Sequence, residues 1–454
     1  MKYTLLATSL ILLTSCSTPT DAGKTSSTYP EPLGEVVYLG DSITAGYIAG
    51  GWTQQTLESS YSVLLAKRFY GDDGVGTDAQ AKFRIPMMAT PGIFVPAVLN
   101  GMTQVGTYAN GTPVRMPQIT PPGAYNQVAL MPQNAGLSAP YHLLAVPGYK
   151  MIDIVERQSI FNRLGDVNPL FNFTLRDKGT ALAQAKRLNP DTVFLWAGNN
   201  EALGSATSGG TVAPFPVESS ADVPGFRSLL GTVLSELASP DRRIVLMNVP
   251  DVTAIPAVNT VGFIAADGRR KLILDLDGDT VWSDTLTFYG KRADGSVRAV
   301  VQGEYVLLNY LLTNRAASGH GLSASAPLEN NEWLDAAEIA SIQTAIGQYN
   351  QVLQQAISAY PNVMLIDMNA FFSTIAEEGY RFPGGTVTYT SAFPEGGLFS
   401  LDGVHPTERG HRVIANKILS ELNTRLSLNL PLYNDSPARN VYFARTPFTT
   451  TIID

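Results

Sequence analysis

Five short, largely apolar runs recur along the chain, and each is typical of a buried strand. They lie at residues 36–39, 142–146, 192–196, 243–247 and 362–366. Runs that are apolar on both faces are characteristic of parallel strands covered by helices on each side. Helical patterns lie between or after them, at about residues 61–70, 177–188, 224–238, 335–358 and 408–425. The alternation of strand and helix predicts an α/β fold with a parallel five-stranded sheet and helices on both of its faces.

Two long segments interrupt this alternation. Residues 71–140 are rich in Gly, Pro, Thr and Gln, show no sustained periodicity and are too long for an ordinary connection. Residues 256–330 contain three Asp-Gly pairs between strand-like runs, which is the pattern of tight turns in β-hairpins. We therefore expect a single domain over residues 34–454 that carries a loop-rich insertion and a β-hairpin insertion.

The N-terminal residues have the layout of an export signal followed by a tether. Residues 1–15 hold one lysine and then an apolar stretch that is too short to span a membrane, as in a signal peptide. The segment ends in Leu-Thr-Ser followed by Cys16, which resembles the lipobox of bacterial lipoproteins, where the cysteine is lipidated. The alternative is an ordinary signal peptide followed by a chance cysteine. Residues 16–33 are rich in Ser, Thr and Pro and predict a flexible tether, so we expect a lipid-anchored protein of the bacterial cell envelope.

Composition narrows the chemistry that the chain can perform. The 454 residues are 44% hydrophobic, which indicates a globular protein with a sizeable core. The formal charge of -8 leaves no basic footprint, so a nucleic acid is not an expected partner. Cys16 is the only cysteine, and the folded body can therefore hold no disulfide, zinc–thiolate site or cysteine nucleophile.

A serine stands at the end of the first predicted strand. Ser42 closes the sequence Gly-Asp-Ser, and catalytic side chains favour the carboxyl ends of strands in α/β sheets. The segment is not a G-x-S-x-G elbow, because Thr44 replaces the second glycine. By itself the segment is a weak signal, because a strand that ends in Gly-Asp-Ser is usually just a turn with no chemical role.

A serine nucleophile needs a base, and the body contains four histidines. His142 begins a strand, His320 lies in a Gly-rich loop, and His411 falls in the last helix, where we expect it to be solvated. His405 differs from these because it precedes that helix and follows Asp402 by three residues, across a glycine. A turn there can bring the carboxylate to the imidazole, as a Ser-His-Asp triad requires.

Two further polar groups follow the second and third predicted strands. At Gly148 the missing side chain lets a backbone N–H approach a ligand closely. Asn200, in the sequence Gly-Asn-Asn-Glu, carries an amide that can donate a hydrogen bond to a developing oxyanion. Each position separately is also a plausible turn.

Together these residues resemble the four sequence blocks of the SGNH (GDSL-type) hydrolases. Gly-Asp-Ser at residues 40–42 matches the first block, Gly148 the second, and residues 402–405 the D-x-x-H block. The third block, usually G-x-N-D, appears as Gly-Asn-Asn-Glu at residues 198–201, with Glu201 in place of aspartate. If Gly198 fills the glycine of that block, Asn199 is the variable position. The Gly-rich loop at residues 50–51 and the long insertions resemble the larger bacterial lipoprotein branch of the family.

The resemblance implies a three-layer α/β/α hydrolase, flavodoxin-like in its sheet, that uses neither a metal nor an organic cofactor. Ser42 would attack an ester carbonyl, His405 would accept its proton, and Asp402 would orient His405. The oxyanion would be held by the N–H groups of Ser42 and Gly148 and by the side chain of Asn200.

The substrate stays open at this level. Members of the family act on carbohydrate acetates, lysophospholipids, thioesters and simple acyl esters, so the resemblance implies an acyl ester of undetermined chain length. Trp52 and the insertion at residues 71–140 are candidate pocket walls. Two alternatives remain: an O-acyltransferase that passes the same acyl group to a sugar hydroxyl, and a surface binding lipoprotein without turnover.

Overall fold

A parallel sheet forms the centre of the protein. The computed structural model describes residues 33–94, 96–107, 113–120, 123, 126, 130–259, 270–274, 280–283, 287–308, 310, 319–393 and 396–435. The expected signal peptide, Cys16 and nearly all of the tether lie outside the described residues. Within them, five parallel strands make one sheet: β1 (Val36–Gly40), β6 (Leu143–Ala145), β7 (Thr192–Trp196), β8 (Arg243–Met247) and β15 (Val363–Ile366). The expected α/β fold with a parallel five-stranded sheet is confirmed.

The strand order places a reversal beside β1. The order is β15-β8-β7-β1-β6, so β1 pairs with β6 on one side and with β7 on the other. The later strands, β7, β8 and β15, then follow one another outward in chain order. Doubly wound sheets bind ligands beyond the carboxyl ends of their strands at such a reversal. The topology therefore points to the segment that follows β1.

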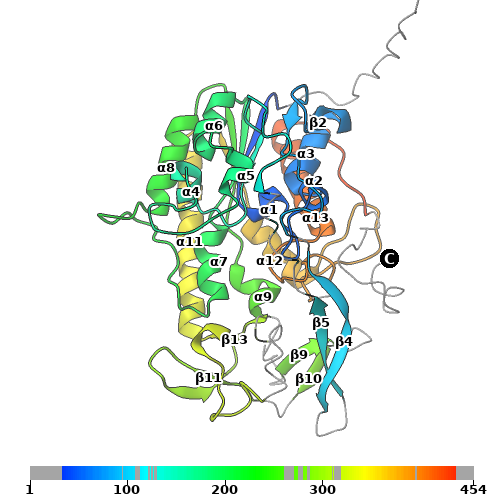
Figure 1. The fold of residues 1–454 in the computed structure, drawn as a ribbon, viewed down its shortest axis with the longest axis vertical. Coiled ribbons are helices and arrows are strands. Elements are labelled where there is room, and N and C mark those ends of the chain that lie inside the picture. The colour runs from blue at the N-terminus through cyan, green and yellow to red at the C-terminus, as the bar shows by residue number, and fades with distance from the viewer. Residues whose placement is uncertain are drawn as a thin grey trace, which may run out of the picture.

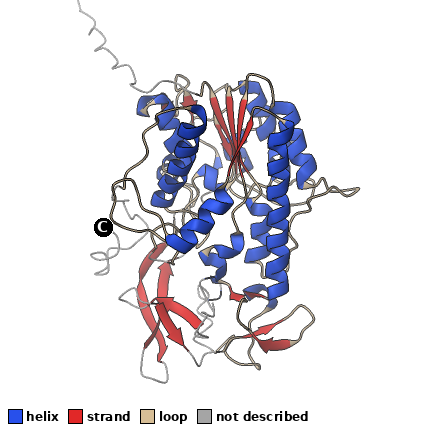
Figure 2. Ribbon diagram, turned by 180° about the vertical axis from the view of Figure 1, so that it is seen from behind, coloured by secondary structure: helices blue, strands red, loops and turns tan. Residues whose placement is uncertain are grey.

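Helices cover both faces of the sheet, and Figure 2 shows the strands between the two groups. On one face α3 (Tyr61–Tyr70) packs with α13 (Glu408–Leu426). On the other face lie α4 (Met151–Glu156), α6 (Ala181–Leu188), α8 (Phe226–Leu237) and α11 (Ala336–Ala359), which contact one another in sequence (Figure 1). These three layers are the arrangement that the resemblance implies.

The longest helix illustrates why the predicted elements form where they do. The Asp335 side chain caps α11 by accepting hydrogen bonds from the N–H groups of Ala337 and Glu338, which have no partner inside the helix. Glu338 completes the capping box by accepting from the Asp335 N–H. One face of the helix is buried through Ile339, Ile342, Ala345, Ile346, Tyr349, Val352, Leu353 and Ala356. The 3.6-residue period of this face is visible in the sequence, and the predicted helix is confirmed.

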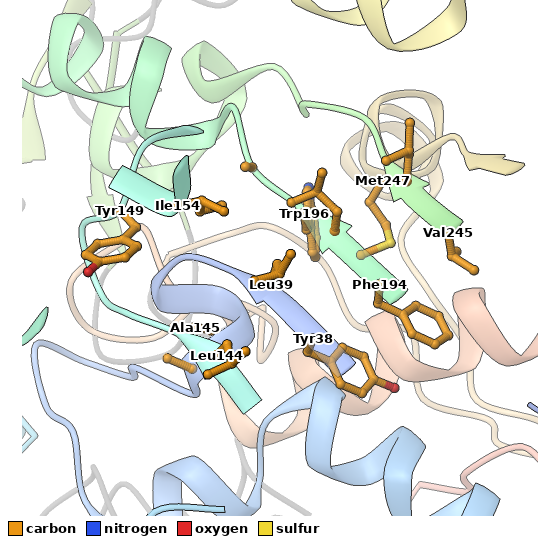
Figure 3. Packing of buried hydrophobic residues seen from close by; sticks show 14 of the residues in the cluster. Tyr38, Leu39, Leu144, Ala145, Tyr149, Ile154, Phe194, Trp196, Val245 and Met247 are labelled. Atoms are coloured by element: carbon orange, nitrogen blue, oxygen red, sulfur yellow. The ribbon is translucent and has the colours of Figure 1, made fainter. Parts of the chain in front are cut away.

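Aromatic packing fixes β1 against its neighbour. All five residues of β1 are buried, as expected for a strand covered on both faces. The Tyr38 ring stacks on Phe194 of β7 with the ring centroids 4.7 Å apart, and Figure 3 shows the two rings side by side. Tyr61 of α3 meets Tyr38 edge-on at 6.2 Å. Such pairs add to the free energy of burial and hold the register of the strands.

The antiparallel strand pairs of the two insertions lie beyond the carboxyl ends of the sheet strands (Figures 1 and 2). Residues 71–140 contain an antiparallel pair, β4 (Val98–Thr107) with β5 (Pro113–Thr120), so the expectation of a loop-rich segment was incomplete. These strands carry no regular alternation of polar and apolar residues, and the pairing is therefore not visible in the sequence. The expected β-hairpin insertion is confirmed by two antiparallel pairs, β9 (Arg270–Leu274) with β10 (Thr280–Ser283), and β11 (Tyr289–Lys291) with β12 (Val297–Ala299).

Shorter elements complete the described residues. The helices are α1 (Ser42–Ala45), α2 (Gln54–Glu58), α5 (Phe171–Leu175), α7 (Asn199–Thr207), α9 (Pro256–Asn259) and α12 (Met368–Glu378), with single 3-10 turns at Asp72–Gly74, Val252–Ala254 and Asn330–Glu332. The strands are β2 (Val75–Gly76), β3 (Phe83–Arg84), β13 (Tyr305–Val306) and β14 (Trp333–Leu334). Over the part of the chain described here, no helix combines the length and apolarity that a membrane crossing requires.

Candidate active site

Ser42 lies where the strand register predicts that neighbouring loops converge. Gly40, the last residue of β1, is level with Ala145 of β6 and with Trp196 of β7. The segments that leave these three strands therefore begin side by side at one edge of the sheet. Ser42 opens α1, whose N-cap Asp41 accepts a hydrogen bond from the Ile43 N–H. The Ser42 side chain is held at the strand tip and is 7% exposed.

His405 connects Ser42 to Asp402 through both nitrogens of its ring. His405 Nε2 is 2.9 Å from Ser42 Oγ, and His405 Nδ1 is 2.7 Å from Asp402 Oδ2. A carboxylate only accepts, so this geometry places the proton on Nδ1 and leaves Nε2 to accept the proton of the serine hydroxyl. The structure brings together the three residues that the sequence singled out.

The Asp402 carboxylate accepts several hydrogen bonds from its surroundings. Besides the His405 ring, it accepts hydrogen bonds from the backbone N–H groups of Val404, His405 and Gly50 and from the Ser400 hydroxyl. Burial raises the pKa of this carboxyl, but the charge and hydrogen bonds of His405 and the Val404 N–H outweigh burial and lower the pKa to about 2. Asp402 is therefore ionised across the ordinary pH range.

The turn between Asp402 and His405 depends on a glycine. Gly403 has a φ of 69°, in the left-handed region that residues with a Cβ atom rarely adopt. A Cβ atom there would also lie 2.8 Å from the Ala257 backbone nitrogen and 2.7 Å from Leu308 Cδ2. The Gly403 carbonyl accepts from the Ala257 N–H at 2.9 Å, which ties the turn to the insertion. A three-residue spacing across glycine is therefore what lets the carboxylate fold back onto the imidazole.

Two backbone N–H groups are available beside the Ser42 hydroxyl. Gly148 follows β6, is exposed, and has a φ of 82° that turns its backbone away from the regular strand path. Ser42 is the first residue of α1, where an N–H has no partner inside the helix. Neither N–H has a hydrogen-bond acceptor among the described residues. Both groups can therefore donate to a bound oxyanion.

The two adjacent asparagines turn in different directions. Asn200 Nδ2 donates to the Tyr149 carbonyl at 2.8 Å, which lays its amide along the loop that carries Gly148. Asn199 Nδ2 donates to Asp41 Oδ2 at 2.8 Å, and this side chain is only 6% exposed. The Asn199 side chain thus supports the segment that carries Ser42. This contact was not predicted, because Asn199 stands at the variable position of the third block.

A family model described as GDSL-like lipase/acylhydrolase matches residues 36–418, a range that runs from the first residue of β1 into α13. The chain belongs to this family. The protein is accordingly an ester hydrolase, and the matched range contains Ser42, Gly148, Asn200, Asp402 and His405.

Several solved structures are similar to this acylhydrolase at low sequence identity. One is an α/β hydrolase from the metagenome of Lake Arreo in Spain, with 13% identity, 85% of this chain and 94% of that chain covered, and a TM-score of 0.32. A lipase/acylhydrolase from Enterococcus faecalis has 13% identity, coverage of 88% and 100%, and a TM-score of 0.30. An acetylxylan esterase from Geobacillus stearothermophilus has 10% identity, coverage of 86% and 94%, and a TM-score of 0.32. Among curated proteins, none matches the sequence.

In this acylhydrolase Glu201 clamps the loop that carries Gly148. Glu201 Oε1 accepts a hydrogen bond from the Met151 N–H at 2.6 Å, at the first residue of α4. The side chain is 2% exposed, and Oε2 has no hydrogen-bond partner among the described residues. Burial raises the pKa of Glu201 to about 7, although the bond from Met151 opposes the shift. Asn200 and Glu201 therefore secure the same loop at two points, Tyr149 and Met151.

Residues of the Gly-rich segment after Ser42 also shape the site, and Tyr47 among them had no predicted role. The Tyr47 ring packs against the His405 ring with centroids 4.9 Å apart, and its hydroxyl donates to the Gly50 carbonyl at 2.8 Å. The Gly50 N–H donates to Asp402 at 2.8 Å. The doubled glycine at residues 50–51 was the only signal of this contact. Trp52, a candidate pocket wall, is instead 1% exposed and packs in the core against Phe173.

The other three histidines lie away from this chain of hydrogen bonds. His142 Nδ1 accepts from the Arg84 N–H, and its Nε2 pairs with Glu35 at 3.0 Å. His320 pairs with Glu332 at 2.6 Å, and this contact fixes its ring although the residue lies in a Gly-rich loop. His411 is fully buried, and the expectation that it is solvated was wrong. Burial lowers the pKa of His411 to about 3, and its Nδ1 accepts from the Tyr61 N–H.

Proposed function

We propose that this family member cleaves an acyl ester through an acyl-enzyme on Ser42, with His405 as the base and Asp402 as the group that orients His405. The observation that supports the proposal most directly is the unbroken hydrogen-bond chain from Ser42 Oγ to His405 to Asp402. The protonation pattern that this chain requires suits proton removal from the serine hydroxyl.

The proposed reaction proceeds in two balanced steps. Ser42 Oγ forms a bond to the ester carbonyl carbon as its proton moves to His405 Nε2, and the bond to the alcohol oxygen then breaks as the alcohol takes that proton. Water attacks the acyl-enzyme in the same way and gives its proton to His405. The bond from the carbonyl carbon to Ser42 breaks, the carboxylic acid leaves, and the proton returns to Ser42 Oγ. A sugar hydroxyl in place of water would make the protein an O-acyltransferase.

Charge that develops on the carbonyl oxygen is stabilised, in this proposal, by the N–H groups of Ser42 and Gly148 and by the amide of Asn200. The bond to the Tyr149 carbonyl uses one of the two N–H groups of the Asn200 amide and fixes its plane. Donors that are positioned before the reaction stabilise the transition state without reorganisation.

The role of Asn200 leads to a quantitative prediction. Removing one oxyanion donor typically costs about 10²–10³ in kcat, because the donor acts mainly on the transition state. We expect Asn200→Ala to lower kcat by this factor with little change in KM, measured by steady-state ester hydrolysis. Asn199→Ala removes the support of Asp41, so it should lower the unfolding temperature more than Asn200→Ala does. A larger loss of kcat in Asn199→Ala than in Asn200→Ala would show that the third block is shifted by one residue.

The proposal as a whole is tested by covalent labelling. A fluorophosphonate probe should modify Ser42 in the full chain, as shown by peptide mass spectrometry, and labelling should abolish hydrolysis of a simple ester. Ser42→Ala should be inert to the probe and inactive while it unfolds at the temperature of the wild type. A fully active Ser42→Ala protein contradicts the assignment, and a labelled protein with no turnover on any ester favours the binding lipoprotein instead.

We also propose that Cys16 carries the lipid that anchors the protein to the bacterial cell envelope, which makes it a member of the lipoprotein branch. The lipobox-like sequence and the polar, Pro-containing stretch at residues 17–33 support this reading. In a bacterial host, the protein should take up radiolabelled palmitate and partition with membranes, whereas Cys16→Ala should do neither. Equal membrane partition of the two forms would contradict the anchor.

A further inference from the structure

A loop next to Gly148 turns large apolar side chains toward the solvent. Residues 159–168, here called the apolar loop, lie between α4 and α5 (Figure 1). Within it the exposed fraction runs from 37% to 60% in four large apolar residues, Ile160, Phe161, Leu164 and Val167. Elsewhere in the described part of the chain, exposed large apolar residues occur singly or as one pair. A gathering of this kind is typical of a surface that another apolar phase or molecule covers.

The polar groups of the apolar loop are bound from the inside. Arg157 is 2% exposed, and its guanidinium donates to the carbonyls of Ile160 and Asp166 at 2.8 and 3.0 Å. The charge of Arg157 is balanced by Asp153 of α4, whose carboxylate lies 2.8 Å from Arg157 Nε. The Asn162 side chain accepts from two N–H groups of the loop and donates to Asp153. The backbone is thus held in the conformation that exposes the apolar side chains, and its bound polar groups lose little when water leaves the outer surface.

The apolar loop ends beside the expected oxyanion site. Asn168 Nδ2 donates to the Pro147 carbonyl at 2.8 Å, one residue before Gly148. A Cβ atom on Gly148 would lie 3.4 Å from the same nitrogen. On the other side of Gly148, Lys150 Nζ pairs with Asp166 Oδ2 at 3.0 Å. Gly148 is itself exposed, so a surface that covers the apolar loop lies next to it.

Charge and size indicate what can cover the apolar loop. Residues 150–166 hold three cations and three carboxylates, so the segment has no net charge that would attract an anionic surface. Arg163, within the loop, is paired with Glu156 at 3.0 Å. Four half-exposed side chains of at most about 250 Å² each present at most about 500 Å², less than the roughly 800 Å² that each partner of a stable dimer buries. A neutral bilayer requires no such matched surface, because binding to it grows with each apolar side chain that enters.

The place where the described chain begins is compatible with a membrane at the opposite end of the sheet. The Leu33 carbonyl accepts from the Thr192 hydroxyl at 2.8 Å, at the first residue of β7, so the chain enters the fold at the amino ends of the strands. Sixteen residues separate Cys16 from Leu33, and fully extended they span at most about 55 Å, about three times the rise of the five residues of β1. A chain anchored at Cys16 can therefore turn the carboxyl ends of its strands toward the membrane that holds it. Because the anchor makes this second contact intramolecular, a small apolar patch suffices for it.

From these observations we propose that the apolar loop docks onto a neutral phospholipid bilayer, with its four large apolar side chains among the lipids. The exposed side of Gly148 then faces the membrane surface. The inference goes beyond the proposed ester chemistry, and it rests on the proposed function only for the anchor that supplies the membrane.

A fluorophore on the apolar loop tests the contact with the full chain. Cys16 is the only native cysteine, so Cys16→Ala combined with Phe161→Cys carries one thiol for a dye. A histidine tag before Met1 holds this chain on phosphatidylcholine vesicles that contain a nickel-chelating lipid, which replaces the anchor. Bromine-substituted acyl chains should quench the dye at position 161, and they should still do so at high salt because the segment has no net charge.

A dye at the other end of the sheet is the control for position. Ser358 is exposed near the end of α11, shortly before the amino end of β15. In the same tethered chain, the dye on Ser358→Cys should not be quenched. Equal quenching at the two positions, or none at position 161, overturns the proposal.

A matched pair of charge variants tests the apolar contact itself. Val167 is 60% exposed and Val212, which follows α7, is 55% exposed. Val167→Asp should lower the ratio of quenched to unquenched dye at position 161 by at least about tenfold, because a carboxylate replaces an apolar group in the lipid, whereas Val212→Asp should leave it unchanged. Both variants should keep the parent's unfolding temperature and its rate of p-nitrophenyl acetate hydrolysis. An equal effect of the two substitutions counts against the loop.

The remaining outcomes separate this proposal from its alternatives. A dimer that Val167→Asp dissociates, with no quenching by vesicles, assigns the apolar loop to a second copy of the chain and overturns bilayer docking. If Ser42→Ala abolishes ester turnover but the dye at position 161 is not quenched, the proposed function stands and the docking falls. If the dye is quenched and Ser42→Ala is fully active, the docking stands and the ester mechanism falls.

Discussion

His405→Ala is expected to lower kcat for ester hydrolysis by about 10⁶-fold, as removal of the triad histidine does in a serine protease. The imidazole is the acceptor at 2.9 Å from Ser42 Oγ, so without it the hydroxyl has no base and the leaving alcohol has no acid. KM should change little, because the ring contributes mainly to the transition state. Steady-state kinetics at saturating ester, together with thermal unfolding to confirm the fold, measures the effect.

The remaining histidines supply controls for this prediction. His142 pairs with Glu35 near the amino end of β6, and His320 pairs with Glu332. The kcat values of His142→Ala and His320→Ala should be compared only for the folded fraction of each variant. Each substitution removes the hydrogen bonds of a largely buried ring and lowers the unfolding temperature. Their kcat should stay within a few-fold of the wild type. A folded His405→Ala protein with wild-type kcat would contradict the proposed mechanism.

Asp402→Asn is expected to lower kcat by about 10⁴-fold, with the site geometry otherwise intact. An asparagine carries no charge to stabilise the imidazolium, and its amide can present a donor to His405 Nδ1, which favours the wrong tautomer. The five hydrogen bonds that converge on the carboxylate in the native protein are all donated to it, so an amide nitrogen in this place would also face donors. The kinetic measurement is the same as for His405→Ala.

Stability against pH gives an independent check on Asp402. Its pKa falls from 3.8 to about 2 on folding, so the carboxylate stabilises the folded state at pH values above the unfolded pKa. This contribution, about 2 kcal/mol, is lost as the pH falls through the folded pKa. The gap in unfolding temperature between the wild type and Asp402→Asn should therefore narrow from about pH 5 to about pH 2. A constant gap would show that the carboxylate gains no charge stabilisation from His405.

Much of the fold is already present in the sequence because its signals are local. The five apolar runs became β1, β6, β7, β8 and β15, and the helix at residues 335–358 became α11, with the Asp335 cap at its start. Burial on two faces and a 3.6-residue period depend on neighbouring residues only, so they can be read without a structure. The same holds for Asp402 and His405, because a three-residue turn across Gly403 brings them together.

Other features depended on contacts between residues far apart in the chain. His411 is buried because its helix packs on α3, where the Tyr61 N–H, 350 positions away, donates to its ring. The two asparagines acquire different partners only when the Asp41 and Tyr149 segments meet beside them. The strands β4 and β5 pair through backbone hydrogen bonds, and no pattern of side chains in the sequence predicts this pairing.

The sequence by itself therefore determined the layers of the fold and singled out the three residues of the proposed triad, since strand ends and short turns are local properties. The tertiary structure alone decided the register that brings Ser42 beside His405, the clamp of Glu201 on the Gly148 loop, and an apolar cavity whose wall includes Leu203, Ile255 and Phe372. A cavity is bounded by side chains from several elements, here α7, α12 and the loops after β8 and before α13. Its shape and polarity arise only when those elements pack, which is why they could not be inferred from the sequence.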